Sequence, residues 1–222
     1  KKRIVDGRGK SNAPVIPSQG SQPPWYVRCS IPALLVLIVS FVFYPVLQNG
    51  FVEWDDAVNF LQNPHYRGLG WEQISWMVTT FHGGHYQPLS WLTLGFDYVL
   101  WGMDPFGYHL TNLLIHAANT VLFYFISRWL LSIALSVSEK NWQLNLSAAF
   151  SALLFGIHPL RVESVAWVTE RRDVLSGLFY LLTIYTYLRA ANVERTHSRR
   201  WLSLACVTYA LSLFAKGTAM TL

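Results

Sequence analysis

Two adjacent carboxylates, Asp55 and Asp56, follow a long apolar run in the stretch FVEWDDAVNF. One member of such a pair can accept the proton of an attacking hydroxyl, while its neighbour binds substrate or raises the pKa of the first. A helix cap or a solvated turn also explains an acidic pair, and for an arbitrary pair it is the commoner explanation. The residues alone therefore make this pair a candidate general base and leave the structural explanation open.

A second group of charges lies between two apolar runs, in the segment HPLRVESVAWVTERRD. If this segment is helical from Pro159, then Arg161 and Arg172 nearly share one face, as do Glu163 and Glu170. An arginine beside a bilayer can hold a phosphate through two parallel hydrogen bonds. The alternative is an interfacial helix whose acids and arginines pair with one another. Charge at membrane depth favours a functional interpretation.

Polar residues also recur within the apolar runs. His109, Asn112, His116 and Asn119 follow one another at intervals of three, four and three residues. Hydrogen bonds between helices explain such a stripe, so we expect a structural role for Asn112 and Asn119 and leave His109 open. Lys216, in FAKGTAM, needs an anion if it is buried. A protein carboxylate or a lipid-linked phosphate would serve.

A metal site has weaker support. His65, His82, His85 and the aspartates could supply ligands, but HGGH lacks the spacing of two histidines on one helix face. The sequence therefore favours chemistry without a metal ion.

The elements that must position these groups belong to a membrane protein, as the composition indicates. Of 222 residues, 52% are hydrophobic and 13% are charged, about half the 25% typical of a soluble domain. The net charge of +5 does not indicate nucleic acid, because Lys and Arg gather before the first apolar run and between two later ones. Between Asn49 and Tyr108 the only such residue is Arg67, against six acids. The positive-inside rule therefore predicts that this segment is external and the N-terminus cytoplasmic.

We predict an all-α fold, a multi-pass membrane bundle with about five transmembrane helices and juxtamembrane helices in the external loop 49–107. The predicted spans are 31–47, 108–131, 146–157, 174–188 and 201 onward. The third would be only about 18 Å long, so it must borrow flanking residues or lie against protein. Within the loop, PLSWLTLGFDYVLWG predicts an interfacial helix that starts at Pro88, with Leu92, Phe96 and Val99 at helical spacing. The domains predicted are a disordered basic cytoplasmic tail, 1–28, and a membrane domain, 29–222.

Several long motifs occur in a fixed order: NGFVEWDDAVNFLQNP, YQPLSWLTLGFDYVLWGMDPFGYHLTNLLIHAANTVLF, LLFGIHPLRVESVAWVTERRDVLSGLFYLLTIYTYL and LFAKGTAMTL. Because they carry these motifs, residues 44–222 resemble the membrane portion of the transmembrane and tetratricopeptide-repeat (TMTC) family and its bacterial relatives. The resemblance implies the fold of the C superfamily of glycosyltransferases (GT-C) and an activity related to protein O-mannosyltransferases. It implies a polyprenyl or dolichyl phosphate sugar, with mannose favoured, as donor, and a Ser or Thr hydroxyl of a protein as acceptor. A C-terminal tetratricopeptide-repeat (TPR) region is also expected.

An acidic pair in the first external loop is the catalytic signature that this resemblance implies, and here it is Asp55 and Asp56. Asp55 is favoured as the base, in an attack that inverts the anomeric carbon. The cations expected at the donor phosphate are Arg161, Arg171, Arg172 and Lys216. The residues expected to support the site are His109, His158, Glu163, Glu170 and Asp173. No metal and no cofactor are expected beyond the lipid-linked donor.

A non-enzymatic protein of several spans, either a transporter or a scaffold with a TPR region that binds partners, is the competing function. It explains the helices and the polar stripe equally well, but not the acids and arginines gathered on one face. Transporters more often place charges near the midplane, within broken helices. The segment HPLRVESVAWVTERRD looks more like bacterial members of the family, which favours a bacterial inner membrane over the endoplasmic reticulum.

Overall fold

The structure is a computed structural model that describes residues 25–192, 195–217 and 220. The predicted tail therefore lies largely outside the described residues, and the first helix starts at Trp25. The elements are α1 (Trp25–Phe43), η1 (Tyr44–Gln48), η2 (Ala57–Leu61), α2 (Trp71–Thr79), α3 (Pro88–Trp101), α4 (Pro105–Ala134), α5 (Trp142–Gly156), α6 (Arg161–Ala166), η3 (Val168–Glu170), α7 (Arg171–Ala191) and α8 (Arg195–Ala215). The described residues contain no strand, only an isolated bridge between His82 and His85. The prediction of an all-α fold is confirmed.

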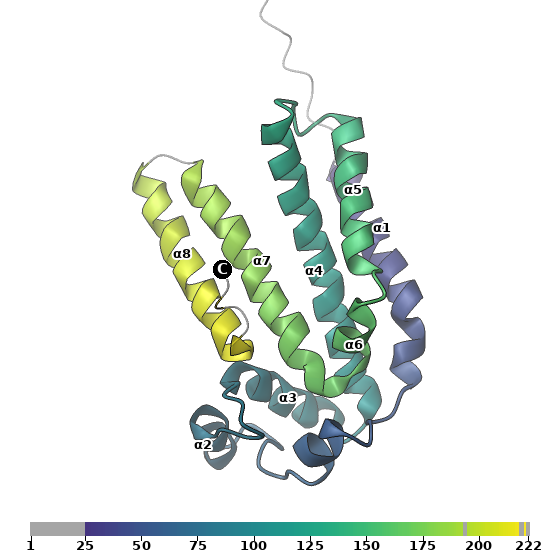
Figure 1. The fold of residues 1–222 in the computed structure, drawn as a ribbon, viewed down its shortest axis with the longest axis vertical. Helices are drawn as coiled ribbons and strands as arrows, with labels where there is room; N and C mark the ends of the chain where they lie inside the picture. Colours follow the sequence, from purple (N-terminus) through teal and green to yellow (C-terminus); the bar gives the residue numbers. More distant parts are fainter. Residues whose placement is uncertain (1–24, 193–194, 218–219, 221–222) are drawn as a thin grey trace, which may run out of the picture.

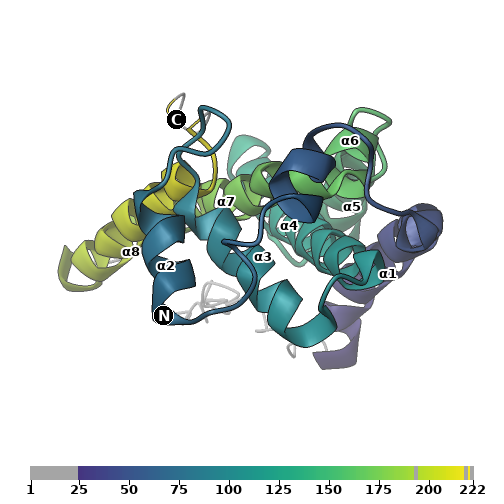
Figure 2. The ribbon, with the colours of Figure 1, turned by 90° about the horizontal axis from the view of Figure 1, so that it is seen from below.

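Five long helices stand side by side and form the bundle (Figure 1). α4 lies at its centre and packs against α1, α5 and α7, while α8 packs along α7. The 49–107 segment, with α2 and α3, lies across one end of the bundle. Seen from that end, α2 and α3 lie in front of the bundle (Figure 2). The predicted arrangement of a helix bundle with short helices gathered at one end is confirmed.

Three stretches are long and apolar enough to cross a bilayer, judged by length and composition among the described residues: Cys29–Gln48, Pro105–Ala134 and Val168–Ala191. The chain is thus a membrane protein. α5 is only 15 residues long, as the short third span predicted, and α8 begins with the basic stretch RTHSRR. Which side of the membrane the N-terminus occupies stays a prediction.

α5 shows how a short helix can occupy a membrane bundle. Ala148, Ala152 and Gly156 recur every four residues and are buried, which lets the backbone approach a neighbouring helix closely. A side chain at Gly156 would meet the Thr120 hydroxyl of α4 at 2.7 Å. The opposite face exposes apolar side chains, such as Phe150, which suits contact with lipid.

The polar stripe of α4 hydrogen-bonds to neighbouring segments. Asn112 donates to the Val165 and Trp167 carbonyls at 3.4 and 3.2 Å. Asn119 donates to the Val174 carbonyl at 2.8 Å. The predicted structural role of both asparagines is confirmed, because the amide of each donates to a backbone carbonyl of another segment.

The 49–107 segment has its own aromatic core, which fixes it to the end of the bundle. Phe60, Tyr66 and Trp91 are buried there together with Tyr108 of α4. α3 begins at Pro88 as predicted. Its apolar residues at helical spacing do not form the buried face, because Phe96 and Val99 are about half exposed, at 52% and 57%, while Trp91, Leu94 and Asp97 point inward. An exposed apolar face agrees with an interfacial position.

The segment from Pro159 is not one continuous helix, so the condition under which Arg161 and Arg172 would share a face is not met. α6 ends at Ala166, and Trp167 is extended, with φ −101° and ψ 121°. The break exposes the Trp167 carbonyl to Asn112 and the Thr169 N–H to Asp56, and these contacts compensate for the lost helical hydrogen bonds. Arg161 and Arg172 therefore lie on separate helices and do not share a face.

Candidate functional site

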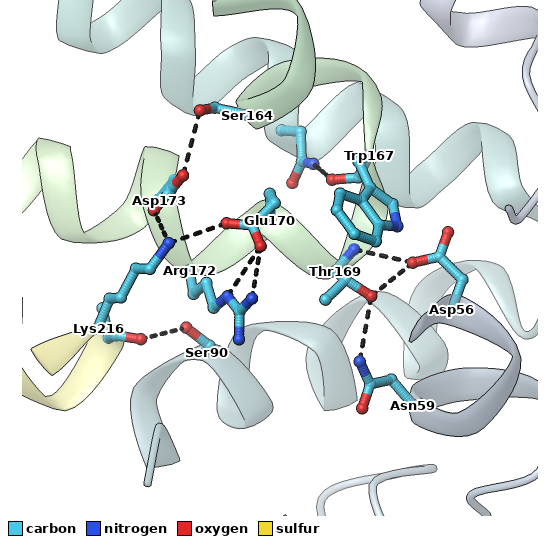
Figure 3. A network of polar contacts seen from close by, with 12 residues as sticks. Asp56, Asn59, Ser90, Ser164, Trp167, Thr169, Glu170, Arg172, Asp173 and Lys216 are labelled. Atoms are coloured by element: carbon cyan, nitrogen blue, oxygen red, sulfur yellow. Dashed lines mark hydrogen bonds and ion pairs between the residues drawn. The ribbon is translucent and has the colours of Figure 1, made fainter. Parts of the chain in front are cut away.

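Asp56 joins the two charged segments that the sequence singled out (Figure 3). Its carboxylate is fully buried. One oxygen accepts from the Thr169 N–H at 3.0 Å and from the Thr169 hydroxyl at 2.6 Å, and the other accepts from the Val52 N–H at 3.0 Å. Asn59 donates to the Thr169 hydroxyl at 3.1 Å. The acidic pair and the arginine-bearing segment, 113 residues apart, therefore meet.

Asp55 differs from its neighbour. It is half-buried, and it makes no side-chain hydrogen bond or ion pair among the residues that the structure describes. A carboxylate with free lone pairs can accept a proton, whereas the carboxylate of Asp56 already accepts three hydrogen bonds. The pair is thus divided into a free acid and a structural anchor.

Four charged side chains, which we call the charged quartet, lie beside this anchor: Glu170, Arg172, Asp173 and Lys216 (Figure 3). Arg172 donates from Nε and Nη2 to one Glu170 oxygen, at 3.1 and 2.5 Å. Lys216 donates to the other Glu170 oxygen at 3.0 Å and also to Asp173. Asp173 accepts a further hydrogen bond from Ser164 at 3.3 Å. The quartet carries two positive and two negative charges, so its net charge is zero.

Arg171 lies elsewhere. Its guanidinium is completely buried and pairs with Asp97 at 2.6 Å. It also donates to the Tyr108 carbonyl at 2.9 Å and to the Asn112 side chain. Burial raises the pKa of Asp97, and Arg171 and Thr111 oppose that shift. The expected place of Arg171 at the donor phosphate is therefore corrected: the side chain holds α3, α4 and α7 together inside the bundle.

A groove of about 520 Å³, which we call the α4–α7 groove, opens on one side of the charged quartet. Its lining residues are His116, Asn119, Phe123, Phe155, Arg161, Ser164, Asp173, Val174, Ser176, Gly177, Tyr180, Leu181 and Ile184. Arg161 places its guanidinium 4.5 Å from the Phe155 ring and makes no ion pair among the described residues. The groove thus combines apolar walls with Arg161, which has no ion pair among the described residues, and with Asp173, whose carboxylate is paired with Lys216.

A second cavity, of about 400 Å³, lies on the other side of the quartet, beside the hairpin turn 82–85, and we call it the hairpin cavity. Its lining residues are Gly84, His85, Tyr86, Gln87, Arg172, Leu213, Phe214, Lys216, Gly217 and Met220. Asp55 lines neither of these two cavities.

The remaining predicted residues are dispersed. His158 is exposed and accepts from the Leu160 N–H at 3.2 Å, and Glu163 is exposed. His109 is fully buried, with no hydrogen-bond partner for either ring nitrogen among the described residues. Of the expected supporting residues, only Glu170 and Asp173 lie in the quartet. No group of three or more His, Cys, Asp or Glu in the described part of the chain could hold a metal ion.

Three residues of this site carried no recognised signal in the sequence. Thr169 lies in a segment that looks like one continuous helix, so the backbone break that turns it toward Asp56 was not predicted. Gln87 lies in a turn-rich stretch without periodicity. Asp97 could have been found, since a lone acid in an apolar helix needs a buried partner.

Replacing Thr169 with valine is expected to loosen the 49–107 segment. The change keeps the β-branched shape but removes the hydroxyl that donates to Asp56, a charge-assisted bond worth about 1.5 to 3 kcal/mol. Faster amide hydrogen exchange over residues 51–60 would report the loss. Thr169→Ser, which retains the hydroxyl, is the control; equal exchange in both variants would contradict the anchor role.

Comparison with known proteins shows which family this chain is similar to. No protein-family model matches the chain, and no solved structure gives a significant match. The chain is 30% identical to protein O-mannosyl-transferase TMTC4 of Homo sapiens over 216 residues, which are 90% of this chain and 28% of that protein. It is 35% identical to protein O-mannosyl-transferase Tmtc3 of Drosophila melanogaster over 129 residues, 54% of this chain and 14% of that protein. It is 32% identical to protein O-mannosyl-transferase tmtc2 of Xenopus laevis over 148 residues, 65% of this chain and 16% of that protein.

The similarity to these relatives agrees with the order of motifs in the sequence and with the all-α membrane bundle. The chain spans about a quarter or less of the length of the relatives that it matches. This chain belongs to the TMTC family.

Proposed function

We propose that the complete protein is a membrane glycosyltransferase of the GT-C type. In this proposal it moves a sugar, with mannose favoured, from a polyprenyl or dolichyl phosphate to a Ser or Thr hydroxyl of a protein. The relatives' name, protein O-mannosyl-transferase, supports the reaction class. One structural observation carries the proposal: Asp56 bonds to Thr169, which holds the acidic pair beside the segment that lines the α4–α7 groove.

The α4–α7 groove suits a lipid phosphate. Phe123, Leu181 and Ile184 supply apolar walls along helices that are long enough to cross a bilayer. Each buried CH₂ of an isoprenoid chain would contribute about 0.8 kcal/mol. Arg161, which lines the groove, supplies N–H donors and a positive charge for the phosphate.

In the proposed reaction the base comes from the 49–107 segment and the cation for the phosphate comes from α6. Asp55 accepts the proton of the acceptor hydroxyl as its oxygen attacks the anomeric carbon. A bond forms from that oxygen to the carbon while the bond from the carbon to the phosphate oxygen breaks, and the carbon is inverted. The departing phosphate takes the electron pair, and Arg161 stabilises its growing negative charge. In this scheme Lys216 and Arg172 act through their ion pairs within the charged quartet, which keep Asp173 and Glu170 in place.

The membrane of the protein and its orientation belong to the same proposal. The groove end that holds Arg161 would face the cell exterior or the lumen, as the charge distribution predicts. The motif HPLRVESVAWVTERRD is the sole basis for favouring a bacterial inner membrane over the endoplasmic reticulum.

Replacing Arg161 with glutamine is expected to raise the KM for the lipid donor about 10- to 100-fold, because a charge-assisted contact worth about 1.5 to 3 kcal/mol is lost. Release of radiolabelled polyprenyl phosphate from the sugar donor by the complete protein in proteoliposomes would measure it. Arg189→Gln is the matched control, because Arg189 lies exposed at the far end of α7. If the unaltered protein released no lipid phosphate with any protein acceptor, a transporter or scaffold would replace the transferase.

A further inference from the structure

Asn59 follows Asp55 by one helical turn and has no role in the scheme above. Burial along this turn is periodic: Asp56 and Phe60, four positions apart, are buried, while Asp55 and Asn59, also four positions apart, are half-buried. Residues four apart lie on one face of a helical turn, with Cβ atoms about 5 to 6 Å from each other. Asp55 and Asn59 therefore share a face, next to the face that carries the buried anchor.

The turn itself, η2, is a π-helix that is held at more than one point. The Gln62 N–H donates to the Ala57 carbonyl at 2.9 Å, which is the hydrogen-bond spacing of a π-helix. Arg67 donates from Nη2 to the Phe60 and Leu61 carbonyls, both at 2.9 Å. Short π turns are frequent at functional sites. The half-buried face of this turn is therefore presented in a defined geometry.

A chain of hydrogen bonds fixes which end of the Asn59 amide faces outward. The Thr169 hydroxyl has a single hydrogen, which it donates to the Asp56 carboxylate at 2.6 Å. Its oxygen is then left to accept from Asn59, so the NH₂ group of the amide faces Thr169, at 3.1 Å. The amide oxygen lies on the side away from Thr169 (Figure 3). Asp56 thus sets the orientation of the Asn59 side chain through Thr169.

The amide oxygen of Asn59 is an unused acceptor with accessible surface. It accepts no hydrogen bond from any described residue, and unlike the amide oxygen of Asn119 it is not fully buried. Asp55, on the same face, also makes no side-chain hydrogen bond or ion pair within the described part of the chain. The face therefore offers two unpaired acceptors, one charged and one neutral, which suit a ligand with two donors close together.

We propose that Asn59 is a substrate-binding residue whose Oδ1 accepts the backbone N–H of the same residue that carries the attacking hydroxyl. The hydroxyl donates to Asp55 and the adjacent N–H donates to Asn59, so the turn selects a hydroxyl that has an N–H beside it. A sugar hydroxyl is the less suitable donor, because the sugar contacts the attacking oxygen on the side away from its base. The inference rests on the proposed function, which makes Asp55 that base.

Peptide binding to the complete protein in lipid nanodiscs tests this inference without turnover. The parent ligand is a fluorescein-labelled peptide with a single threonine among alanines. Replacing the threonine with N-methylthreonine keeps the hydroxyl but removes the N–H, and should weaken binding about fivefold, the effect of one neutral hydrogen bond. N-methylation at an alanine distant from the threonine is the matched control and should leave the affinity unchanged. In Asn59→Leu the parent and N-methylthreonine peptides should bind equally.

The ratio of these two dissociation constants separates a contact from a structural role. Asn59→Leu also loses the hydrogen bond to Thr169, but damage to the turn would weaken both peptides equally and leave the ratio at about five. Thr169→Ser, which keeps the hydroxyl that orients the amide, should keep the ratio. A ratio that persists in Asn59→Leu, equal affinities in the unaltered protein, no binding, or displacement of the peptide by methyl α-mannoside would each overturn the proposal. Because binding needs no sugar transfer, such a result is distinguishable from a failure of the transferase assay.

Discussion

Replacement of Asp55 with asparagine is expected to lower the rate of sugar transfer by a factor of about 10² to 10⁴, the usual contribution of a general base. The melting temperature should stay unchanged, because the Asp55 carboxylate makes no described hydrogen bond or ion pair that the substitution would break. The rate would be measured with saturating lipid donor and acceptor, so that a change in kcat is separated from a change in KM.

Asp56→Asn is the matched comparison. An asparagine can offer only one acceptor oxygen where Asp56 offers two, so its NH₂ group would face either the Val52 N–H or the Thr169 donors. We expect this variant to lose stability as well as activity. Transfer that survives in Asp55→Asn, or a melting temperature that falls equally in both variants, would contradict the division of the pair into base and anchor.

Replacement of Arg171 with methionine is expected to destabilise the bundle by about 3 to 5 kcal/mol, because it leaves the buried Asp97 without its partner. The Asp97 and Arg171 side chains are only 2% and 0% exposed, so water cannot replace the lost contact. Unfolding by denaturant in detergent micelles, followed by tryptophan fluorescence, would measure the change.

Two further variants separate this ion pair from general damage to α7. Arg189→Met removes an exposed arginine from the same helix and should cost no more than about 1 kcal/mol. The double variant Asp97→Asn with Arg171→Met should recover part of the loss, because no unpaired charge remains. A single Arg171→Met variant as stable as the unaltered protein would show that Arg171 does not hold the helices together.

The sequence predicted the helices well because hydrophobic periodicity and length are local properties. The start of α3 at Pro88, the short α5 and the structural use of Asn112 and Asn119 were all visible in the residue pattern. Which face of α3 is buried was not visible, because both faces carry apolar residues and one of them is exposed at the end of the bundle.

Among the candidate site residues, pattern reasoning singled out two segments that the structure brings together, but it did not separate the side chains within them. Arg161 and Arg172 would nearly share one face only if the segment were a single helix, and the chain breaks at Trp167 between them. The same reasoning placed Arg171 with the surface cations, although Asp97 holds it inside the bundle. The three arginines look equivalent in the sequence, yet Arg171 is completely buried while Arg161 and Arg172 are only partly buried.

By itself, the sequence determined the class of this protein: a membrane helix bundle of the TMTC family with its charged segments gathered at one end. Composition, charge distribution and motif order are enough for that, because each can be determined along the chain without knowing which distant residues are in contact. Only the tertiary structure decided that Asp56 accepts three hydrogen bonds while Asp55 accepts none among the described residues, that Arg161 lines a groove without forming an ion pair, and that Gln87 lines a separate cavity. These properties depend on hydrogen bonds and burial between residues as far as 113 positions apart, and no local pattern encodes them.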